Sequence, residues 1–285
     1  MSGEDPAFTD PGSIRTVAVA GLGLIGGSVA RDLAALGVRV LGHDRDRAAV
    51  DAALREGFVS AALGDGFAGV EDADALVIAV PVHAAAAVLE RALPRLGGVR
   101  LVTDAGSTKR AIVAAAERLG IGARFVGAHP FAGDHRAGVE ASRLGLFAGA
   151  RVYLCPAAGA SAEARGMARG LWTMLGGTVM EIGAEEHDAR LAWTSHLPQL
   201  VSTALAAVLA ARGIPRADLG PGGRDVTRLA ASSPEMWTGI ALENADALLA
   251  ALDATGAQLA ALRDALARRD EDAIRAAFAS GQAWS

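Results

Sequence analysis

Short apolar runs rich in β-branched residues alternate with alanine-rich helical segments from Ile14 to Ile182. The helical segments begin at capping residues and often stop at glycine, as at Gly37, Gly57 and Gly120. The expected strands are residues 16–20, 39–43, 75–80, 100–103, 123–126, 151–155 and 178–182. A chain that alternates strand and helix joins parallel strands by right-handed crossovers, so the pattern predicts an α/β fold with a doubly wound, largely parallel Rossmann-type sheet.

The pattern changes after Ile182, because almost every later segment is helical. We therefore expect a disordered leader at residues 1–13, a dinucleotide-binding domain at residues 14–182, and an all-α substrate and dimerisation domain at residues 183–285. Segments 197–211 and 240–267 carry more apolar and alanine surface than a domain of this size can bury alone. An isologous homodimer through the helical domain is therefore expected.

Composition excludes several classes of protein. The 285 residues are 52% hydrophobic and 21% charged, as in a soluble globular protein, and the net charge of −5 gives no reason to expect a nucleic-acid partner. The single cysteine, Cys155, cannot form an internal disulfide or a cysteine-rich metal site, so we expect a cytoplasmic protein without metal. The uncharged run 191–211 contains Pro198 and Gln199, which favours a buried helix over a membrane span.

A glycine-rich turn joins the first strand to the first helix. Gly21, Gly23 and Gly26, with Leu24 and Ile25 inside the turn, have the G-x-G-x-x-G spacing of a dinucleotide-binding loop. The first glycine permits a tight turn, the second lets the backbone approach a pyrophosphate, and the third allows close packing of helix on strand. A small-molecule reaction that uses a nicotinamide dinucleotide is therefore expected.

Two further segments are expected to contact the cofactor. Asp44 closes the second strand 18 residues after Gly26, where a carboxylate would accept the adenine ribose hydroxyls, so NAD is favoured. Arg45 would suit a 2′-phosphate, which leaves NADP possible, and Asp44 has the alternative role of capping the next helix. Val80 and Pro81 form a turn at the same sheet edge, with Pro81 expected chiefly as a rigid turn residue.

Two polar residues follow later strands at this sheet edge. Ser107 lies between a strand and a helix, and His129 lies beyond the next strand. Because the carboxyl ends of parallel strands meet at one edge, both residues are expected near the nicotinamide ring. Considered separately, Ser107 has the alternative role of a helix cap and His129 that of a structural histidine.

With these motifs the sequence closely resembles the prephenate and arogenate dehydrogenases of tyrosine biosynthesis. The shared motifs occur in family order from residue 16 to beyond residue 237. They are GLGLIGGS at 21–28, TDAGSTK at 103–109, GAHPFAG at 127–133, HDARLAWTSHLPQ at 187–199, RDVTRLA at 224–230 and PEMW at 234–237. The resemblance implies NAD(P)-dependent oxidative decarboxylation of a cyclohexadienol that is aromatised to a phenol.

The resemblance also implies roles for individual residues. His129 would be the base that takes the proton of the ring hydroxyl, and Ser107 its orienting partner. Arg228 would bind the side-chain carboxylate, and Trp237 would form an aromatic wall. His196 is either part of the pocket wall or a satisfied core histidine. His187 and Asp188 stand at an expected helix start and are expected to cap and pack rather than react.

Two departures from the commonest family pattern bear on the substrate. Gln199 stands where histidine is frequent, and it can donate or accept a hydrogen bond but cannot carry charge. Asp134 follows the HPFAG loop where the family often has a neutral Thr or Ser. An aspartate there would attract the ammonium of arogenate and repel dianionic prephenate, so arogenate is the expected preference, with a surface turn residue as the alternative.

Two other functions compete with this interpretation. A β-hydroxyacid or 6-phosphogluconate-like dehydrogenase would need a catalytic lysine in the helical domain, and no lysine occurs between Gly183 and Ser285. A non-catalytic, dinucleotide-sensing regulator would keep the fold without the base. The presence of both Ser107 and His129 argues against the regulator.

Overall fold

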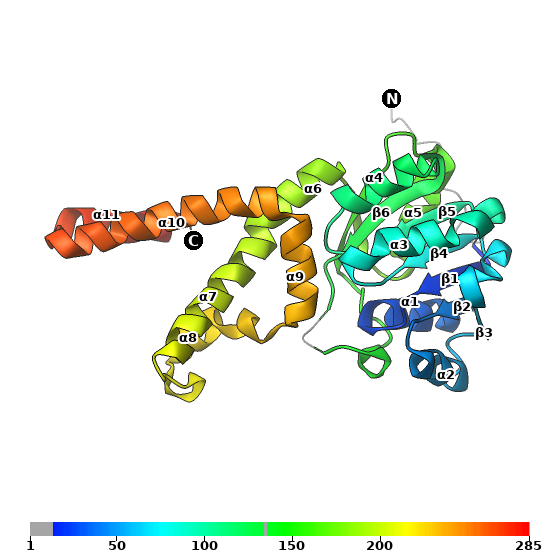
Figure 1. Ribbon diagram of the computed structural model, residues 1–285, viewed down its shortest axis with the longest axis horizontal. Coiled ribbons are helices and arrows are strands. Elements are labelled where there is room, and N and C mark those ends of the chain that lie inside the picture. The colour runs from blue at the N-terminus through cyan, green and yellow to red at the C-terminus, as the bar shows by residue number, and fades with distance from the viewer. Residues whose placement is uncertain (1–13, 134–135, 285) are drawn as a thin grey trace, which may run out of the picture. The chain divides into compact units, whose positions relative to one another are not determined.

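The computed structural model describes residues 14–133 and 136–284 (Figure 1). The expected leader at residues 1–13 and Asp134 lie outside the described residues. The chain forms two compact units. The first, here called the sheet unit, comprises Met1–Arg190 and Ala231–Glu243, and the second, the helical unit, comprises Leu191–Ala230 and Asn244–Ser285.

Eight strands of the described residues form one sheet in the order β3-β2-β1-β4-β5-β6-β7-β8. They are β1 Thr16–Ala20, β2 Arg39–His43, β3 Ala61–Ala62, β4 Ala75–Ile78, β5 Leu101–Asp104, β6 Phe125–Pro130, β7 Arg151–Pro156 and β8 Thr178–Glu181. Every neighbouring pair is parallel except β6 and β7. The predicted doubly wound, largely parallel sheet is confirmed.

The sheet contains two features that the sequence pattern did not predict. Strand β3 has only the two residues Ala61 and Ala62, which is too short for an apolar run rich in β-branched residues. Strands β6 and β7 pair antiparallel, from Val126 opposite Pro156 to Pro130 opposite Val152. A parallel pair needs a long crossover, usually a helix, and the described part of the β6–β7 connection contains only the short 3-10 helix Val139–Ala141.

Helices cover both faces of the sheet (Figure 1). The helices of the sheet unit are α1 Leu24–Ala35, α2 Arg47–Arg55, α3 Val82–Ala92, α4 Arg110–Arg118, α5 Ala162–Met174, most of α6 Ala184–Leu191, and α9 Pro234–Glu243. Short 3-10 helices lie at Asp65–Phe67, Val70–Asp72, Leu93–Gly98 and Gly122–Arg124. Val17 and Val19 of β1 pack with α1, α2 and α5, and the alternating Ala18 and Ala20 pack with α3 and α4. This two-sided burial explains why the strands read as continuous apolar runs.

Glycines end three helices of the sheet unit, as the sequence predicts. Gly37, Gly57 and Gly120 follow α1, α2 and α4 with φ of 80°, 80° and 73°. These values lie in the left-handed region, where an L side chain is strained and glycine is not.

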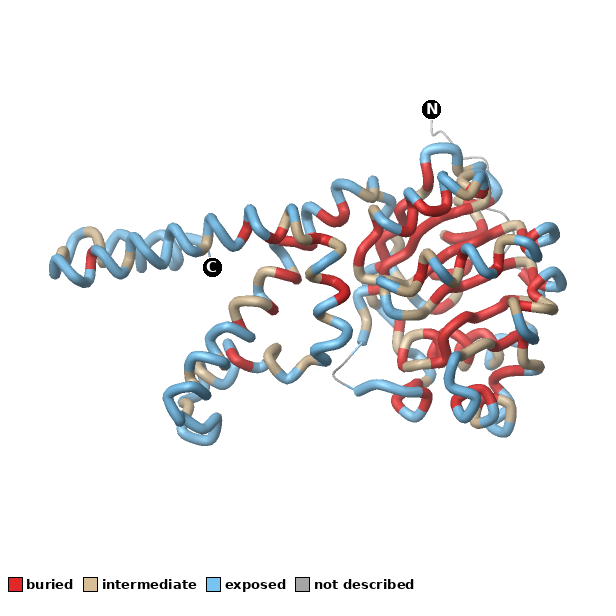
Figure 2. The backbone as a smooth tube through the Cα atoms, viewed as in Figure 1, coloured by how far each residue is buried: buried red, intermediate tan, exposed pale blue. Residues whose placement is uncertain are grey.

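The helical unit contains a π-helical turn at Ala192–His196, α7 Leu197–Ala211, α8 Pro221–Val226, α10 Ala245–Arg268 and α11 Glu271–Trp284, with short 3-10 helices at Arg216–Asp218 and Arg228–Ala231. Its long helices are mostly exposed, as Figure 2 shows for α10 and α11. The expectation that residues 191–211 form a buried helix is wrong for the single chain, since Gln199 and Ser202 are the buried residues of α7. The few helices of this unit do not enclose one another.

Helix α10 is the one helix of the described residues that is long and apolar enough to cross a membrane by length and composition. It has 24 residues, and its most apolar window has a mean hydropathy of 1.2 and is 11% buried. Length and composition do not distinguish such a helix from one that packs against another protein chain.

Candidate active site

The glycine loop after β1 has the geometry of a phosphate-binding turn. Gly21 has φ of +94°, and a Cβ there would lie 2.4 Å from the Ala79 carbonyl oxygen. A Cβ on Gly26 would lie 1.8 Å from the Gly21 carbonyl oxygen, whereas one on Gly23 would meet no atom within 4 Å. Gly23 is also the N-cap of α1. The tight turn, the close helix and the open space at the helix N-terminus fit a dinucleotide pyrophosphate.

Asp44 lies beside this loop at the end of β2. Its Oδ2 accepts a hydrogen bond from the Leu22 N–H at 2.7 Å, and its Oδ1 accepts one from the Asp46 N–H at 2.8 Å. The alternative that Asp44 caps the next helix is wrong, because Asp46 caps α2 by accepting from the Ala48 N–H. The backbone bonds fix the Asp44 carboxylate next to the glycine loop, where a ribose would lie.

The other predicted cofactor residues lie at the same edge. Arg45 is exposed, and its guanidinium lies 3.9 Å from the carboxylate of Glu235 on α9. The Val80 side chain lies 3.0 Å from the position of a Cβ on Gly21. Pro81 precedes α3 with φ of −51°, in agreement with a rigid turn.

Lys109, the only lysine of the sequence, is fully buried behind the ends of β5 and β6. Its ammonium pairs with the carboxylate of Asp104, which is 1% exposed. The same carboxylate accepts hydrogen bonds from the Gly106 N–H at 2.8 Å and the Ala128 N–H at 3.0 Å. One buried ion pair therefore joins the loop that carries Ser107 to the strand that carries His129.

Ser107 is half-buried in the loop between β5 and α4. The alternative that it caps the following helix is wrong. Helix α4 begins at Arg110, and the carboxylate of Asp188 on α6 accepts the N–H groups of Lys109 at 2.8 Å and Arg110 at 3.0 Å. The hydroxyl of the neighbouring Thr108 donates to the carboxylate of Glu243 on α9. Ser107 therefore occupies a loop that other residues anchor on both sides.

His129 is near the carboxyl end of β6 and 9% exposed. Its Nδ1 lies 2.9 Å from Nε2 of His187, and Nδ1 of His187 lies 2.7 Å from Oδ1 of Asp188. His187 and Asp188 are 0% and 1% exposed. The rings of Phe131 and Tyr153 pack against the two histidines, with centroids 4.8 Å from His129 and 5.5 Å from His187. The three polar side chains form a continuous chain of contacts inside an apolar and aromatic wall.

The protonation states in this chain follow from burial and hydrogen bonding. Burial lowers the pKa of His187, although its hydrogen bond to Asp188 opposes the shift. Burial alone would raise the pKa of Asp188, but the hydrogen bonds from His187 and from the N–H groups of Arg110 and Lys109 outweigh burial and lower it. His187 is therefore neutral and Asp188 ionised near neutral pH.

The contact between His187 and His129 was missed from the sequence. The expectation that His187 and Asp188 cap the start of their own helix is wrong, because α6 begins at Ala184. Asp188 instead accepts from the Arg110 N–H at the start of α4, and His187 contacts His129. A usable signal lay in helix periodicity, because the apolar residues Leu191 and Ala192 follow His187 and Asp188 at i+4. That spacing assigns both ionisable residues to the buried face, where each needs a partner.

Three predicted substrate residues belong to the helical unit. His196 is 1% exposed, and its Nδ1 lies 3.1 Å from the amide nitrogen of Asn244. Gln199 donates from Nε2 to the Leu229 carbonyl oxygen at 2.8 Å. Arg228 is exposed and lines a hollow of about 340 Å³ together with Leu197, Pro198, Val201, Ser202, Asp225, Val226 and Leu229. Arg228 is therefore the only basic residue among the described residues that line this mainly apolar hollow.

Trp237 is half-buried on α9, which groups with the sheet unit although its sequence lies among the helical segments. Helix α9 packs against α3, since a Cβ on Gly239 would lie 3.0 Å from Nδ1 of His83. Asp134, on which the expected preference for arogenate rests, is outside the described residues. Among residues 14–133 and 136–284, no group of three or more His, Cys, Asp or Glu residues could hold a metal ion.

Comparison with known proteins identifies the family in both parts of the chain. Residues 29–181 match the family "Prephenate dehydrogenase, nucleotide-binding domain", and residues 183–280 match "Prephenate dehydrogenase, dimerization domain". A prephenate dehydrogenase of Bacillus subtilis is 35% identical over 250 residues, which are 84% of this chain and 66% of that protein. The chain thus spans about two thirds of that relative.

Two further matches cover nearly the full length of both proteins. A cyclohexadienyl dehydrogenase of Zymomonas mobilis is 34% identical over 274 residues, 93% of each chain. The crystal structure of prephenate dehydrogenase from A. aeolicus, in complex with hydroxyphenyl propionate and NAD+, superposes with a TM-score of 0.85 at 30% identity over 94% of this chain and 96% of that one. The chain therefore belongs to the prephenate dehydrogenase family, a family of NAD(P)-dependent dehydrogenases.

Proposed function

We propose that the chain catalyses oxidative decarboxylation of a cyclohexadienol acid and prefers arogenate to prephenate, forming tyrosine or 4-hydroxyphenylpyruvate. Hydride leaves the carbinol carbon, carbon dioxide leaves the opposite ring carbon, and the ring becomes a phenol. NAD, when bound, accepts the hydride. The observation that most supports this chemistry is that the segments carrying Ser107 and His129 are joined through one buried carboxylate, Asp104, at the ends of adjacent strands.

In this proposal His129 takes the proton of the ring hydroxyl and Ser107 orients that hydroxyl. Arg228 binds the side-chain carboxylate, a task suited to its planar guanidinium. Further substrate contacts are proposed for His196, Gln199 and Trp237. His129→Asn is expected to lower kcat by about 10²- to 10⁴-fold while the Kd for NAD stays nearly constant, because the base acts on the substrate. Turnover within a few-fold of the unmodified protein would contradict the assignment of the base.

The preference for arogenate is proposed from the charge of Asp134. Arogenate carries an ammonium where prephenate carries a keto group, and a charge-assisted hydrogen bond contributes about 1.5–3 kcal/mol, roughly tenfold or more in relative efficiency. Steady-state assays with both substrates and both cofactors test the proposal. Asp134→Asn should move the ratio of kcat/KM values toward prephenate. An unchanged ratio, or no arogenate preference before mutation, would make Asp134 a turn residue.

We propose NAD as the preferred cofactor because the fixed carboxylate of Asp44 would bond ribose hydroxyls and repel a 2′-phosphate. Asp44→Ser should shift the preference toward NADP, with Arg45 available to bind the phosphate. Higher efficiency with NADP in the unmodified protein would mean that Arg45 outweighs Asp44.

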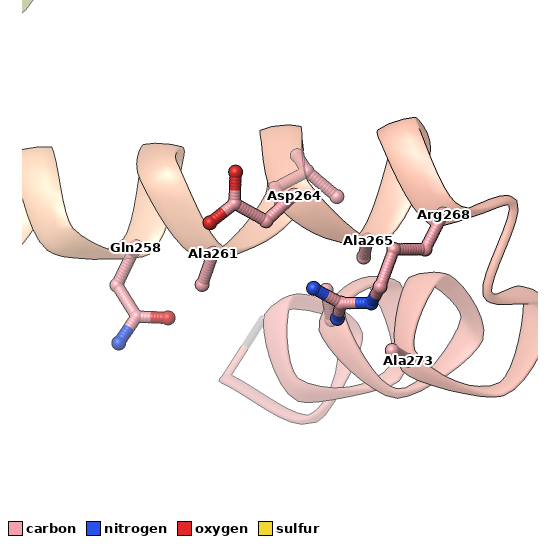
Figure 3. A pocket seen from close by; sticks show the side chains of 8 residues that line it. Gln258, Ala261, Asp264, Ala265, Arg268 and Ala273 are labelled. Atoms are coloured by element: carbon pink, nitrogen blue, oxygen red, sulfur yellow. The ribbon is translucent and has the colours of Figure 1, made fainter.

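We also propose that the helical unit forms a homodimer, in which a second copy rather than lipid covers its apolar side chains. Large exposed apolar residues are Val208 of α7, Leu249, Leu259 and Leu266 of α10, and Phe278 of α11, each 57–72% exposed. Alanines 261, 265 and 273 line a hollow between α10 and α11, where small side chains allow close helix approach (Figure 3). Sedimentation equilibrium at micromolar concentration should give the mass of two chains, and a monomer would contradict the proposal.

A further inference from the structure

We propose that His187 and Asp188 are positioning residues for the base: they hold His129 in the tautomer with hydrogen on Nδ1, so that Nε2 carries the lone pair used to accept the substrate proton. The inference rests on the proposed role of His129 as the base. It concerns two residues that do not themselves touch substrate in this proposal.

Asp188 forms the buried end of the contacts that run from Asp188 through His187 to His129. The Asp188 carboxylate accepts the N–H groups of Lys109 and Arg110 at 2.8 and 3.0 Å, and the Arg110 guanidinium Nε lies 3.4 Å from its Oδ2. A carboxylate surrounded by donors is ionised and can only accept hydrogen bonds. The contact of 2.7 Å between Asp188 and Nδ1 of His187 is therefore a hydrogen bond that His187 donates.

The tautomer of one ring then determines that of the next. A neutral His187 with hydrogen on Nδ1 has its lone pair on Nε2, because a neutral imidazole carries one N–H. His187 Nε2 lies 2.9 Å from Nδ1 of His129, so His129 must donate from Nδ1. In neutral His129 the remaining lone pair is therefore on Nε2.

Protonation of His129 strengthens the hydrogen bonds that link it through His187 to Asp188. When Nε2 of His129 accepts the hydroxyl proton, the O–H bonding pair stays on the substrate oxygen and His129 becomes an imidazolium. Its Nδ1–H still points to the acceptor nitrogen of His187, and the ionised carboxylate of Asp188 lies behind that ring. The buried negative charge stabilises the imidazolium, as a carboxylate does behind a catalytic histidine in other enzymes.

Several other groups face this chain and set its electrostatics. Lys109 lowers the pKa of His187, whereas the Asp188 and Asp104 carboxylates raise it, although burial has the largest effect. The ring of Tyr153 on β7 packs edge-on against His187. Because Lys109 is paired with Asp104 inside the fold, Asp188 is the carboxylate in direct contact with His187.

Two substitutions of His187 separate positioning from packing. His187→Gln keeps an oxygen near the Nε2 position that can accept from His129, whereas His187→Leu fills the space without an acceptor. We expect His187→Leu to lower kcat by about 10²-fold or more with little change in KM, and His187→Gln to retain clearly more activity. A purely structural role would reduce both variants together with their thermal stability.

Asp188→Asn removes the charge while keeping the shape. It should lower kcat and move the acidic limb of the kcat/KM profile to lower pH, because the imidazolium of His129 loses its counter-charge. Glu186→Gln is the matched control, since Glu186 lies on the same helix, pairs with Arg190 and has a side chain that is 64% exposed. The control should leave both kcat and the acidic limb unchanged.

Nitrogen-15 NMR of histidine-labelled protein without substrate tests the inference independently of activity. The His129 signals, assigned with His129→Asn, should show hydrogen on Nδ1 in the unmodified protein and in His187→Gln, and lose this preference in His187→Leu. If neither prephenate nor arogenate is oxidised, the proposed function fails while the tautomer result stands. If the enzyme is active but His187→Leu keeps the Nδ1–H tautomer and kcat within threefold, the positioning role is overturned.

Discussion

Substitution of the buried lysine should destabilise the sheet unit more than any surface charge change. Lys109→Met preserves the length and unbranched shape of the side chain but leaves the Asp104 carboxylate, 1% exposed, without its cation. Only the N–H groups of Gly106 and Ala128 remain among the hydrogen bonds described for that carboxylate. Removing one partner of a buried ion pair costs about 3–5 kcal/mol, because the remaining charge is neither solvated nor paired.

This loss converts to a shift in melting temperature. For a chain of this size each kcal/mol corresponds to about 2–4 °C, so Lys109→Met should lower Tm by roughly 6–20 °C. Urea unfolding followed by circular dichroism at fixed protein concentration measures the free energy. The matched control is Arg118→Met, whose pair with Glu90 is exposed, with side chains 61% and 51% accessible. That change should cost at most about 1 kcal/mol.

The double variant Lys109→Met with Asp104→Asn separates the ion pair from packing. It removes the uncompensated charge, so it should be more stable than Lys109→Met alone. Lys109→Met within 1 kcal/mol of the unmodified protein, or a double variant that is no more stable than the single one, would refute the reasoning. The same ion pair links the segments that carry Ser107 and His129. Lys109→Met should therefore also lower activity at temperatures at which the protein is still folded.

Three further predictions follow from local geometry. Gly26→Ala should abolish NAD binding measured by calorimetry, because its Cβ would lie 1.8 Å from the Gly21 carbonyl oxygen. The control is Gly37→Ala, which should leave NAD binding intact because a Cβ there would meet no atom within 4 Å. Asp46→Ala should destabilise the protein by about 1 kcal/mol in urea unfolding through loss of the α2 cap. Folding lowers the pKa of His187 from its ordinary value of 6.5, so just below that pH the unfolded chain binds more protons than the folded one. The free energy of unfolding should therefore fall as pH decreases through 6.5. The fall should be smaller in His187→Gln.

The sequence by itself determined the architecture of the sheet unit. Continuous apolar runs and helix-stop glycines are local signals, so most of the strands and the ends of these helices were predictable from neighbouring residues. The glycine loop was equally predictable, because the positive φ of Gly21 and the close approach of Gly26 to the Gly21 carbonyl oxygen both arise within the turn. Their positions after successive strands also placed Ser107 and His129 at this edge, and the family resemblance implied their roles.

Only the tertiary structure decided how the polar side chains pair. Asp188 caps a helix that begins 78 residues earlier, at Arg110, and His187 contacts a histidine on a different strand. Such partners are set by the packing of α6 against the sheet, which no local pattern encodes. The sequence likewise left open whether Asp44 and Ser107 cap helices, and the structure shows that Asp46 and Asp188 provide those caps. Local physics fixes the elements, whereas burial of ionisable groups forces partners that only the assembled fold supplies.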